Sequence, residues 1–309
     1  MREILSLGAA ASAALQRGRR RLRVHSVFPS TVNLAIEGLP CLLALTGPRW
    51  ADFPHSLTLE DEEGPARLGL APGDVGETSG DMISIVTARG RVELGLSRAR
   101  QVPARKLGPA ASLGAAFEAC AARLAEFQAD IGADLRLEAV LSTAELPGGD
   151  ALAEALVARA RLLLEALGGE GGDAESLPSA VHSLIGAGRG LTPSGDDFLS
   201  GLLAALGTRG RAWTAPAAIL GGAIEAGLGR TNEISASFLR LALAALWPGP
   251  LADLAAALAA EDPGAARASL EGLLAFGLSS GADLATGFLA GLALGRPREV
   301  VGISGSGRS

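Results

Sequence analysis

The sequence predicts an α+β protein in which a small β-rich domain, barrel-like or sandwich-like, precedes a mostly α-helical domain. Between about residues 22 and 105, short β-rich runs are separated by Gly, Pro and Asp. From about residue 111, long Ala- and Leu-rich stretches repeat their apolar residues with helical periodicity. A chain of 309 residues also suits two ordinary domains. We therefore predict a β-rich domain with an N-terminal helix at 1–108 and a helical domain at 109–309.

Within the first domain, the Ala-rich residues 6–15 predict an amphipathic helix with a basic end at Arg17 and Arg19–Arg21. An acidic residue, Glu3, precedes this weakly apolar run, which disfavours a secretory signal peptide. The segment 76–81 predicts an exposed turn. Strands are predicted at 34–36, 41–45, 82–86 and 91–96.

In the second domain, two stretches are apolar on nearly every side, at 197–206 and 284–294, which predicts central helices enclosed by others. The full set of predicted helices is 112–129, 150–168, 197–208, 214–227, 232–246, 251–260, 264–276 and 282–294.

Composition excludes several kinds of chemistry. Of the 27 basic residues only Lys106 is a lysine, and it lacks the glycine framework of a phosphate-binding loop, so this loop, a pyridoxal Schiff base and a catalytic lysine are all disfavoured. Tyr is absent and His occurs three times, which disfavours a multi-histidine metal centre. The net charge of −6 argues against nucleic acid or an anionic membrane as partner.

Two further observations concern the cellular compartment of the protein and its relation to membranes. The two cysteines, Cys41 and Cys120, stand far apart without a C-x-x-C pattern, which predicts a reduced, cytoplasmic protein. No stretch of about 20 residues stays apolar, so the sequence predicts no transmembrane segment.

The segment Gly186–Gly201 carries the clearest functional pattern. Its glycines, followed by Pro193, describe a loop that delivers backbone N–H groups to a helix start, the physical basis of an anion site. In the alternative interpretation Ser194 caps the helix, Asp197 completes a capping-box-like pair and the helix dipole favours Asp196. The predicted anion-binding residues here are Gly188, Arg189, Gly190, Thr192, Ser194, Gly195 and Asp196.

A second segment repeats this helix start. Residues 194–204 align without gaps with residues 280–290, and Ser, Gly, Asp, Gly, Leu and Ala match in register. If the two helices face one another, Asp197 and Asp283 meet across a shared pocket, with Ser280 and Gly281 beside them. Such a pair suits a divalent cation, a substrate amide or ammonium group, or phosphate bridged by Mg²⁺. The alternative is a duplicated packing unit in which both aspartates only cap.

A third polar loop, at 229–237, also opens a helix. Thr231 is predicted as its N-cap, while Arg230, Asn232 and Ser235 are candidates for hydrogen bonds to a ligand. The predicted substrate- and anion-binding set also includes Thr231, Ser280 and Gly281. If the loop is structural, Thr231 is simply a cap and Arg230 is solvated. Upstream of the glycine loop, His182 is the candidate general base.

Together the motifs resemble those of a bacterial family, long described only as a domain of unknown function, that includes the AllH subunit of oxamate carbamoyltransferase. The resemblance rests on G-x-G-L-T-P-S-G-D-D-F-L at 188–199, T-N-x-I-S at 231–235 and S-G-x-D at 280–283. It implies a subunit of a multisubunit enzyme of purine or allantoin catabolism, which converts oxalurate and phosphate to oxamate and carbamoyl phosphate. It also implies a small anionic substrate, phosphate and other protein subunits as partners.

Two functional hypotheses follow, and the sequence leaves open whether the chain is itself an enzyme. The first is a carbamoyltransferase subunit with Asp197, Asp283 and His182 as catalytic residues and Mg²⁺ as candidate cofactor at the two aspartates. The second is a non-catalytic ligand-binding or scaffolding subunit of a carboxylase-like or transferase complex.

Overall fold

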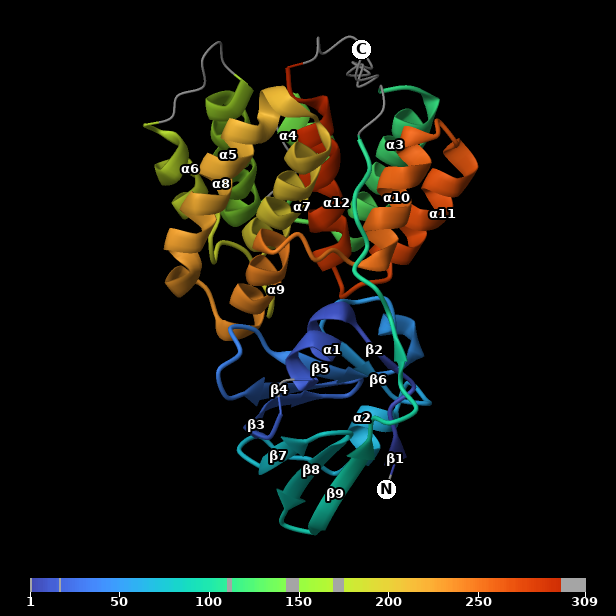
Figure 1. The fold of residues 1–309 in the computed structure, drawn as a ribbon. Helices are drawn as coiled ribbons and strands as arrows, with labels where there is room; N and C mark the ends of the chain where they lie inside the picture. Colours follow the sequence, from blue (N-terminus) through green and yellow to red (C-terminus); the bar gives the residue numbers. More distant parts are fainter. Residues whose placement is uncertain (1, 17, 110–112, 143–149, 169–174, 296–309) are drawn as a thin grey trace. The chain divides into compact units, whose positions relative to one another are not determined.

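A computed structural model describes residues 2–16, 18–109, 113–142, 150–168 and 175–295. Contacts along the chain divide it into two compact units. The first comprises Met1–Lys106 and Leu246–Gly249, and the second comprises Leu107–Ala245 and Pro250–Ser309. A curled β-sheet followed by helices confirms the predicted α+β fold class (Figure 1).

In the first unit, ten described strands form one sheet in the order β1-β9-β8-β7-β3-β4-β5-β6-β2-β10. The sheet curls into a half-barrel (Figure 1). Its strands are β1 (Arg2–Glu3), β2 (Ser6–Leu7), β3 (Arg20–Phe28), β4 (Thr31–Ile36), β5 (Leu43–Thr46), β6 (Ser56–Thr58), β7 (Val75–Ser79), β8 (Met82–Thr87), β9 (Gly90–Gly95) and β10 (Arg100–Gln101).

The core of this unit lies on one face of the sheet. Alternating residues such as Val24, Leu34 and Ile83 are fully buried, as the two-residue period of a strand requires. The short helices α1 (Ala9–Leu15) and α2 (Gly64–Arg67) accompany the sheet. The 3₁₀ turn Pro48–Trp50 precedes β6. The predicted N-terminal helix is therefore present but begins at Ala9, because the preceding Ser6 and Leu7 pair with β6 and β10.

The predicted exposed turn at 76–81 is confirmed only at Gly80 and Asp81, which connect β7 to β8, and is wrong for residues 76–79. Residues 76–79 lie in β7, between β3 and β8. Thr78 is buried, and its hydroxyl accepts a hydrogen bond from the Arg20 N–H at 3.2 Å. At Gly76 an added Cβ would meet the backbone of Ser84 and Ile85, so this turn-like residue serves close strand packing.

A distant segment completes the first unit. Trp247, which is buried, pairs with Arg105 in an isolated antiparallel bridge. The Gly249 N–H donates to the Asp52 carbonyl oxygen at 2.9 Å. Residues 246–249 thus join a unit that otherwise ends at Lys106.

The second unit is helical throughout its described part. It contains α3 (Ala115–Ile131), α4 (Leu137–Leu141), α5 (Ala151–Gly168), α6 (Leu177–Leu184), α7 (Ser194–Thr208), α8 (Thr214–Gly227), α9 (Glu233–Leu243), α10 (Gly249–Ala259), α11 (Pro263–Leu274) and α12 (Ser280–Ala293), with 3₁₀ turns at Arg211–Trp213 and Leu228–Arg230. Within the described residues, none of the helices has the length and apolarity needed to cross a membrane.

Helices α7 and α12 pack side by side at the centre of this unit (Figure 1). Every residue of α12 from Gly281 to Ala293 is buried, which confirms the predicted central position. At Gly201 an added Cβ would meet the α12 backbone at Leu284 and Phe288. At Gly287 it would meet the α7 backbone at Phe198 and Leu202. These contacts run in the same direction along both helices, so the helices are parallel and their N-termini lie together.

Candidate functional site

The glycine loop folds back onto the start of α7. Gly186, Gly188 and Gly190 have φ values of +75°, +126° and +93°, which favour glycine. The Gly195 N–H donates to the Ala187 carbonyl oxygen at 2.8 Å, and a Cβ at Gly195 would collide with the backbone of Leu184. The loop is therefore held against the end of α6 by backbone contacts that only glycine permits.

The start of α12 repeats this arrangement. The Gly281 N–H donates to the Phe276 carbonyl oxygen at 3.0 Å, and a Cβ at Gly281 would collide with the backbone of Leu273. Just before the helix, Gly277 has a φ of +64°. The structure thus extends the repeat seen in the sequence backwards into the loop and the end of the preceding helix.

Asp197 and Asp283 lie within the first turns of these parallel helices, and both are buried, with 5% and 0% of their surface exposed. Among the described residues, Asp197 Oδ2 and both carboxyl oxygens of Asp283 have no hydrogen-bond partner. A buried carboxylate without a partner is costly, so these oxygens are candidates to bind a proton or a ligand.

Hydroxyl groups from both helix starts surround the two carboxyl groups. Thr192 Oγ1 lies 2.6 Å from Ser280 Oγ, and these two hydroxyls lie beside Asp197. Ser194 and Ser279 lie beside Asp283, but neither completes a hydrogen bond of ordinary geometry to it. Each aspartate therefore faces the first serine of the opposite helix.

The electrostatic surroundings favour the protonated form of both acids. Burial raises the pKa of Asp197 well above its usual value, and the negative charge of Asp283 raises this pKa further. Burial raises the pKa of Asp283 to about 7, against the opposing effect of the neighbouring serine hydroxyls. Asp283 therefore exchanges its proton near neutral pH.

The adjacent Asp196 has a different environment. Its Oδ1 accepts from the Gly186 N–H at 2.9 Å, and its Oδ2 accepts from the hydroxyls of Thr231 and Ser235, both at 2.6 Å. Burial raises the pKa of Asp196, while these hydrogen bonds oppose the rise. Asp196 thus fastens the glycine loop and the start of α9 to α7.

Both capping predictions are corrected by the structure. The N-cap of α9 is Asn232, whose side chain accepts from the Ser235 N–H at 3.1 Å, whereas the Thr231 hydroxyl donates to the charged Asp196. The N-cap of α7 is Pro193, and Ser194 is the first helical residue. A carboxylate is the stronger acceptor, which explains why the threonine hydroxyl points away from its own helix.

Five of the first-turn N–H groups that an anion could use are bonded within the chain. The Asp196 and Asp197 N–H groups donate to the Pro193 carbonyl oxygen, and the Asp283 N–H donates to that of Ser279. Gly195 and Gly281 are also engaged, and the buried side-chain atoms here that lack a partner among the described residues are carboxyl oxygens. The arrangement therefore suits a cation or an N–H donor better than a bare anion.

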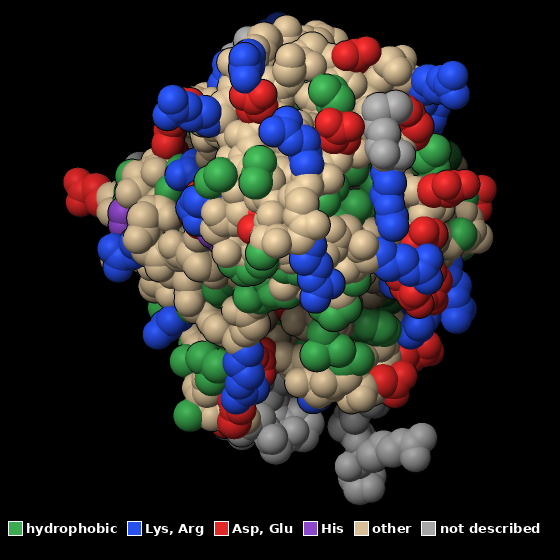
Figure 2. Space-filling view, turned by 90° about the horizontal axis from the view of Figure 1, so that it is seen from below, with side chains coloured by type: hydrophobic (Ala, Val, Ile, Leu, Met, Phe, Trp, Pro, Cys, Tyr) green, Lys and Arg blue, Asp and Glu red, His purple; other side chains and the backbone are tan. Residues whose placement is uncertain are grey.

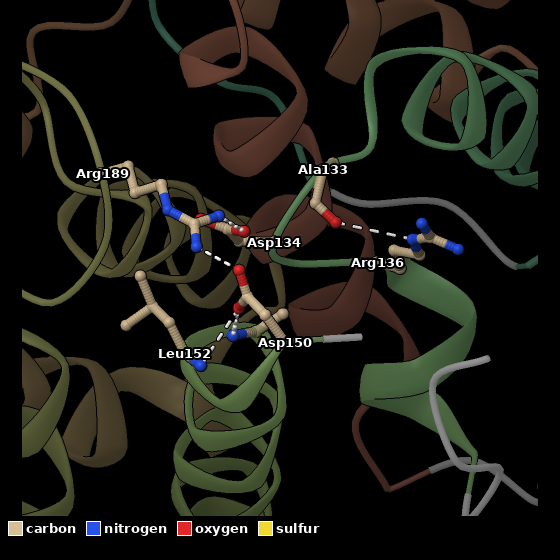
Figure 3. Close-up of polar contacts among 7 residues, drawn as sticks. Ala133, Asp134, Arg136, Asp150, Leu152 and Arg189 are labelled. Atoms are coloured by element: carbon tan, nitrogen blue, oxygen red, sulfur yellow. Dashed lines mark hydrogen bonds and ion pairs between the residues drawn. The ribbon is translucent and has the colours of Figure 1, made fainter. Parts of the chain in front are cut away.

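Arg189, the predicted anion ligand, instead binds two carboxylates (Figure 3). Its Nη1 donates to Asp134 Oδ1 at 2.7 Å, and its Nη2 donates to Asp150 Oδ2. Asp150 also accepts from the N–H groups of Leu152 and Ala153 at the start of α5. The hydrogen bond from Arg189 lowers the pKa of Asp150, whereas burial raises that of Asp134.

Sequence reasoning did not identify Asp134 and Asp150. Asp150 is the first residue of the predicted helix at 150–168 and immediately precedes α5, and Asp at this position is a recognisable N-cap signal. Asp134 lies in the short loop between α3 and α4, and its charge helps to raise the pKa of Asp283. No sequence pattern links that loop to the start of α12.

The remaining candidates lie at the margin of this cluster or face elsewhere. Arg230 is exposed at the end of a 3₁₀ turn, and Asn232 is exposed, with Nδ2 donating to the Leu191 carbonyl oxygen at 2.8 Å. His182 Nε2 lies 3.0 Å from the Ala223 carbonyl oxygen, so the ring faces α8. That nitrogen acts as a donor, which leaves Nδ1 as the basic atom.

The donor set for a metal ion is limited to oxygen. Within the described ranges, no group of three or more His, Cys, Asp and Glu side chains is arranged around one point. A cation between Asp197 and Asp283 would therefore complete its coordination with hydroxyls, water or substrate. Mg²⁺ is commonly held in this way, by one or two carboxylates with water and substrate phosphate.

Comparison with known protein families yields a match that includes the starts of both α7 and α12. A family model described as oxamate carbamoyltransferase subunit AllH matches residues 184–292, from the end of α6 to nearly the end of α12. This range contains all three motifs on which the resemblance rests, so the predicted resemblance is confirmed over this part of the chain. No solved structure matches the chain.

Proposed function

We propose that the chain is a subunit of a carbamoyltransferase-like enzyme acting on oxalurate, oxamate and carbamoyl phosphate, with its ligand site at the paired starts of α7 and α12. The family match over residues 184–292 supports the reaction class. The buried Asp197–Asp283 pair, with three carboxyl oxygens lacking partners among the described residues, is the observation that carries the site.

The chemistry of the carbamoyl group suits these side chains. Its NH₂ group offers two donors to ionised carboxyl oxygens, and its carbonyl oxygen can accept from a protonated aspartic acid. The pKa of Asp283, raised by burial to about 7, lets this side chain donate or accept a proton at neutral pH. We therefore assign Asp197 and Asp283 the roles of orienting the carbamoyl group and exchanging a proton with it.

The anionic part of the substrate would use the remaining polar groups of the cluster. The hydroxyls of Thr192 and Ser280 are half-buried at the outer end of the helix starts. Arg189 is exposed and held only by side chains, so phosphate or a substrate carboxylate can compete with Asp134 and Asp150 for its guanidinium. Arg230, exposed at the end of its turn, is a further candidate for this role.

The surroundings of the site are part of the same proposal. We place the enzyme in the cytoplasm, where the reduced Cys41 and Cys120 side chains fit, and assign it other protein subunits as partners. Basic and acidic side chains are interspersed on the molecular face in Figure 2. Such a face fits protein partners and small ligands better than a nucleic-acid polyanion.

A second function, a non-catalytic subunit that holds the ligand for a partner, is favoured by one observation. The carboxyl oxygens that lack a partner among the described residues are buried in the isolated chain. A site closed in this way fits a subunit that becomes competent only within the complex. Binding of oxalurate by the isolated chain, without turnover until its partner subunits are added, would favour this function.

The test is carbamoyl phosphate formation from oxalurate and phosphate by the chain reconstituted with its partner subunits. We expect Asp197→Asn and Asp283→Asn each to lower kcat by about 100-fold or more, the usual range for removal of a general acid or base. The control is Asp253→Asn, at an exposed position on α10. Full activity in both aspartate variants would contradict the proposed site, and an inactive wild-type complex would contradict the proposed reaction.

A further inference from the structure

The unpartnered carboxyl oxygens at the two helix starts need a binding partner. Asp283 is completely buried, yet neither of its oxygens is hydrogen-bonded among the described residues, and Asp197 Oδ2 is in the same state. Each carboxyl group lies beside the first serine of the opposite helix, so both groups lie where the starts of α7 and α12 meet. The unfilled acceptors are therefore gathered around one place.

The donor atoms there are all hard oxygens. Besides the two carboxyl groups, they are the hydroxyls of Thr192, Ser194, Ser279 and Ser280. Within the described part of the chain, no histidine or cysteine is among the groups that act on either aspartate. Oxygen donors of this kind select Mg²⁺, Mn²⁺ or Ca²⁺ over Zn²⁺.

The balance of charge also favours a cation. The side-chain charges that act on Asp197 and Asp283 come from other aspartates, including Asp134. The guanidinium of Arg189, the predicted anion ligand, is bound to Asp134 and Asp150. The two helix N-termini contribute only about half a positive charge each. Two ionised carboxylates therefore exceed the positive charge that the fold supplies.

We infer that Asp197 and Asp283 hold one divalent cation of the Mg²⁺ class between the starts of α7 and α12, with coordination positions left open for substrate oxygens. The inference rests on the proposed function and revises one part of it, because carboxyl groups that hold a cation stay ionised and act as ligands rather than as proton donors. Such a cation would bind the phosphate of a carbamoyl phosphate reaction directly. Metal binding does not depend on turnover, so it can be tested on the isolated full-length chain.

The experiment is a titration of chelator-stripped protein with Mn²⁺, in which electron paramagnetic resonance measures free Mn²⁺ and Mg²⁺ serves as competitor. We expect one Mn²⁺ per chain, displaced by Mg²⁺, with affinity lowered at least about 10-fold in both Asp197→Asn and Asp283→Asn. The matched control Asp253→Asn should bind as the wild type does. Circular dichroism confirms that each variant is folded.

Two results would overturn the cation site: no Mn²⁺ binding below about 1 mM, the weak end of protein cation sites, or unchanged binding in both aspartate variants. If an aspartate variant does not fold, the double variant Thr192→Val, Ser280→Ala takes its place, because it removes two oxygen donors without changing charge. Wild-type affinity in that variant would also overturn the site. Full turnover of the reconstituted enzyme in chelator would refute the cation while leaving the proposed reaction intact.

Discussion

The close approach of α7 and α12 makes Gly201→Ala a sharp test of the site's architecture. A Cβ at Gly201 would lie 2.8 Å from Phe288 N and closer still to the Leu284 carbonyl oxygen. Ordinary contact begins at 3.4 Å, so the helices must separate by about 0.6 Å or more. The obstructing atoms belong to the backbone and cannot rotate away.

The expected cost follows from two opposing effects. Overpacking of a core costs about 1–3 kcal/mol and occasionally more, and an obstructing backbone places this site at the upper end. Alanine returns up to about 1 kcal/mol through its higher helix propensity. We expect Gly201→Ala to lower the free energy of unfolding by about 2 kcal/mol. The thermal midpoint of a unit of this size should fall by about 4–8 °C.

Gly207→Ala is the matched control within the same helix. An added Cβ at Gly207 meets nothing within 4 Å, so the propensity effect acts alone. This variant should be stabilised by up to about 1 kcal/mol. Urea and thermal unfolding, followed by circular dichroism, measure both variants. If Gly201→Ala proves as stable as Gly207→Ala, the backbones of α7 and α12 are not in contact and the pairing of Asp197 with Asp283 has no basis.

Three further predictions concern buried acids and a buried histidine. Because burial raises the pKa of Asp283 from 3.8 to about 7, the metal-free wild type should lose stability as pH rises from about 4 to 7, by up to about 4 kcal/mol. Asp283→Asn should not lose stability in this way. If the free energies of unfolding of the variant and the wild type, measured with urea, change in parallel with pH, the prediction is contradicted. Asp196→Ala should cost about 3 kcal/mol because the hydroxyls of Thr231 and Ser235 lose their acceptor. If the urea midpoint of Asp196→Ala equals that of the wild type, the hydrogen bonds to Asp196 from Gly186, Thr231 and Ser235 contribute nothing to stability. Burial lowers the pKa of His55 from 6.5 to about 4, so the wild type should lose up to about 3 kcal/mol as pH falls from about 6.5 to 4, and His55→Gln should not. The measurement is the difference in the free energy of unfolding between His55→Gln and the wild type at each pH. A difference that stays constant between about pH 6.5 and 4 would refute this prediction.

Helices could be predicted closely because their signals are local. The predicted helix at 214–227 coincides with α8, and the repeated S-G-x-D segments were recognised as two similar helix starts. Strand β3 was missed although Arg21–Val24 alternates charged and apolar residues. Strand β7 was missed because its sequence, VGETS, has no alternating apolar pattern and its place is set by pairing with β3 and β8. Periodicity indicates which face of a segment is buried, but the partner strand is set by the fold.

The site could be predicted only in part, for a related reason. Asp197 and Asp283 were identified because the repeat placed them in equivalent positions. The roles of Thr231 and Arg189 depend on acceptors far away in sequence, Asp196 and the Asp134–Asp150 pair. A residue's local context reveals what it can donate, whereas the fold determines what receives the hydrogen bond.

The membership of residues 246–249 in the first unit has a consequence for the order of assembly during synthesis. The ribosome releases Trp247 about 140 residues after Lys106, when most of the helical unit has already emerged. The sheet can form early, but the bridge to Arg105 and the hydrogen bond to Asp52 must wait for that segment. Final consolidation of the β-rich unit is therefore a late, long-range step, which is intrinsically slow. A fragment that ends at residue 108 would never reach it.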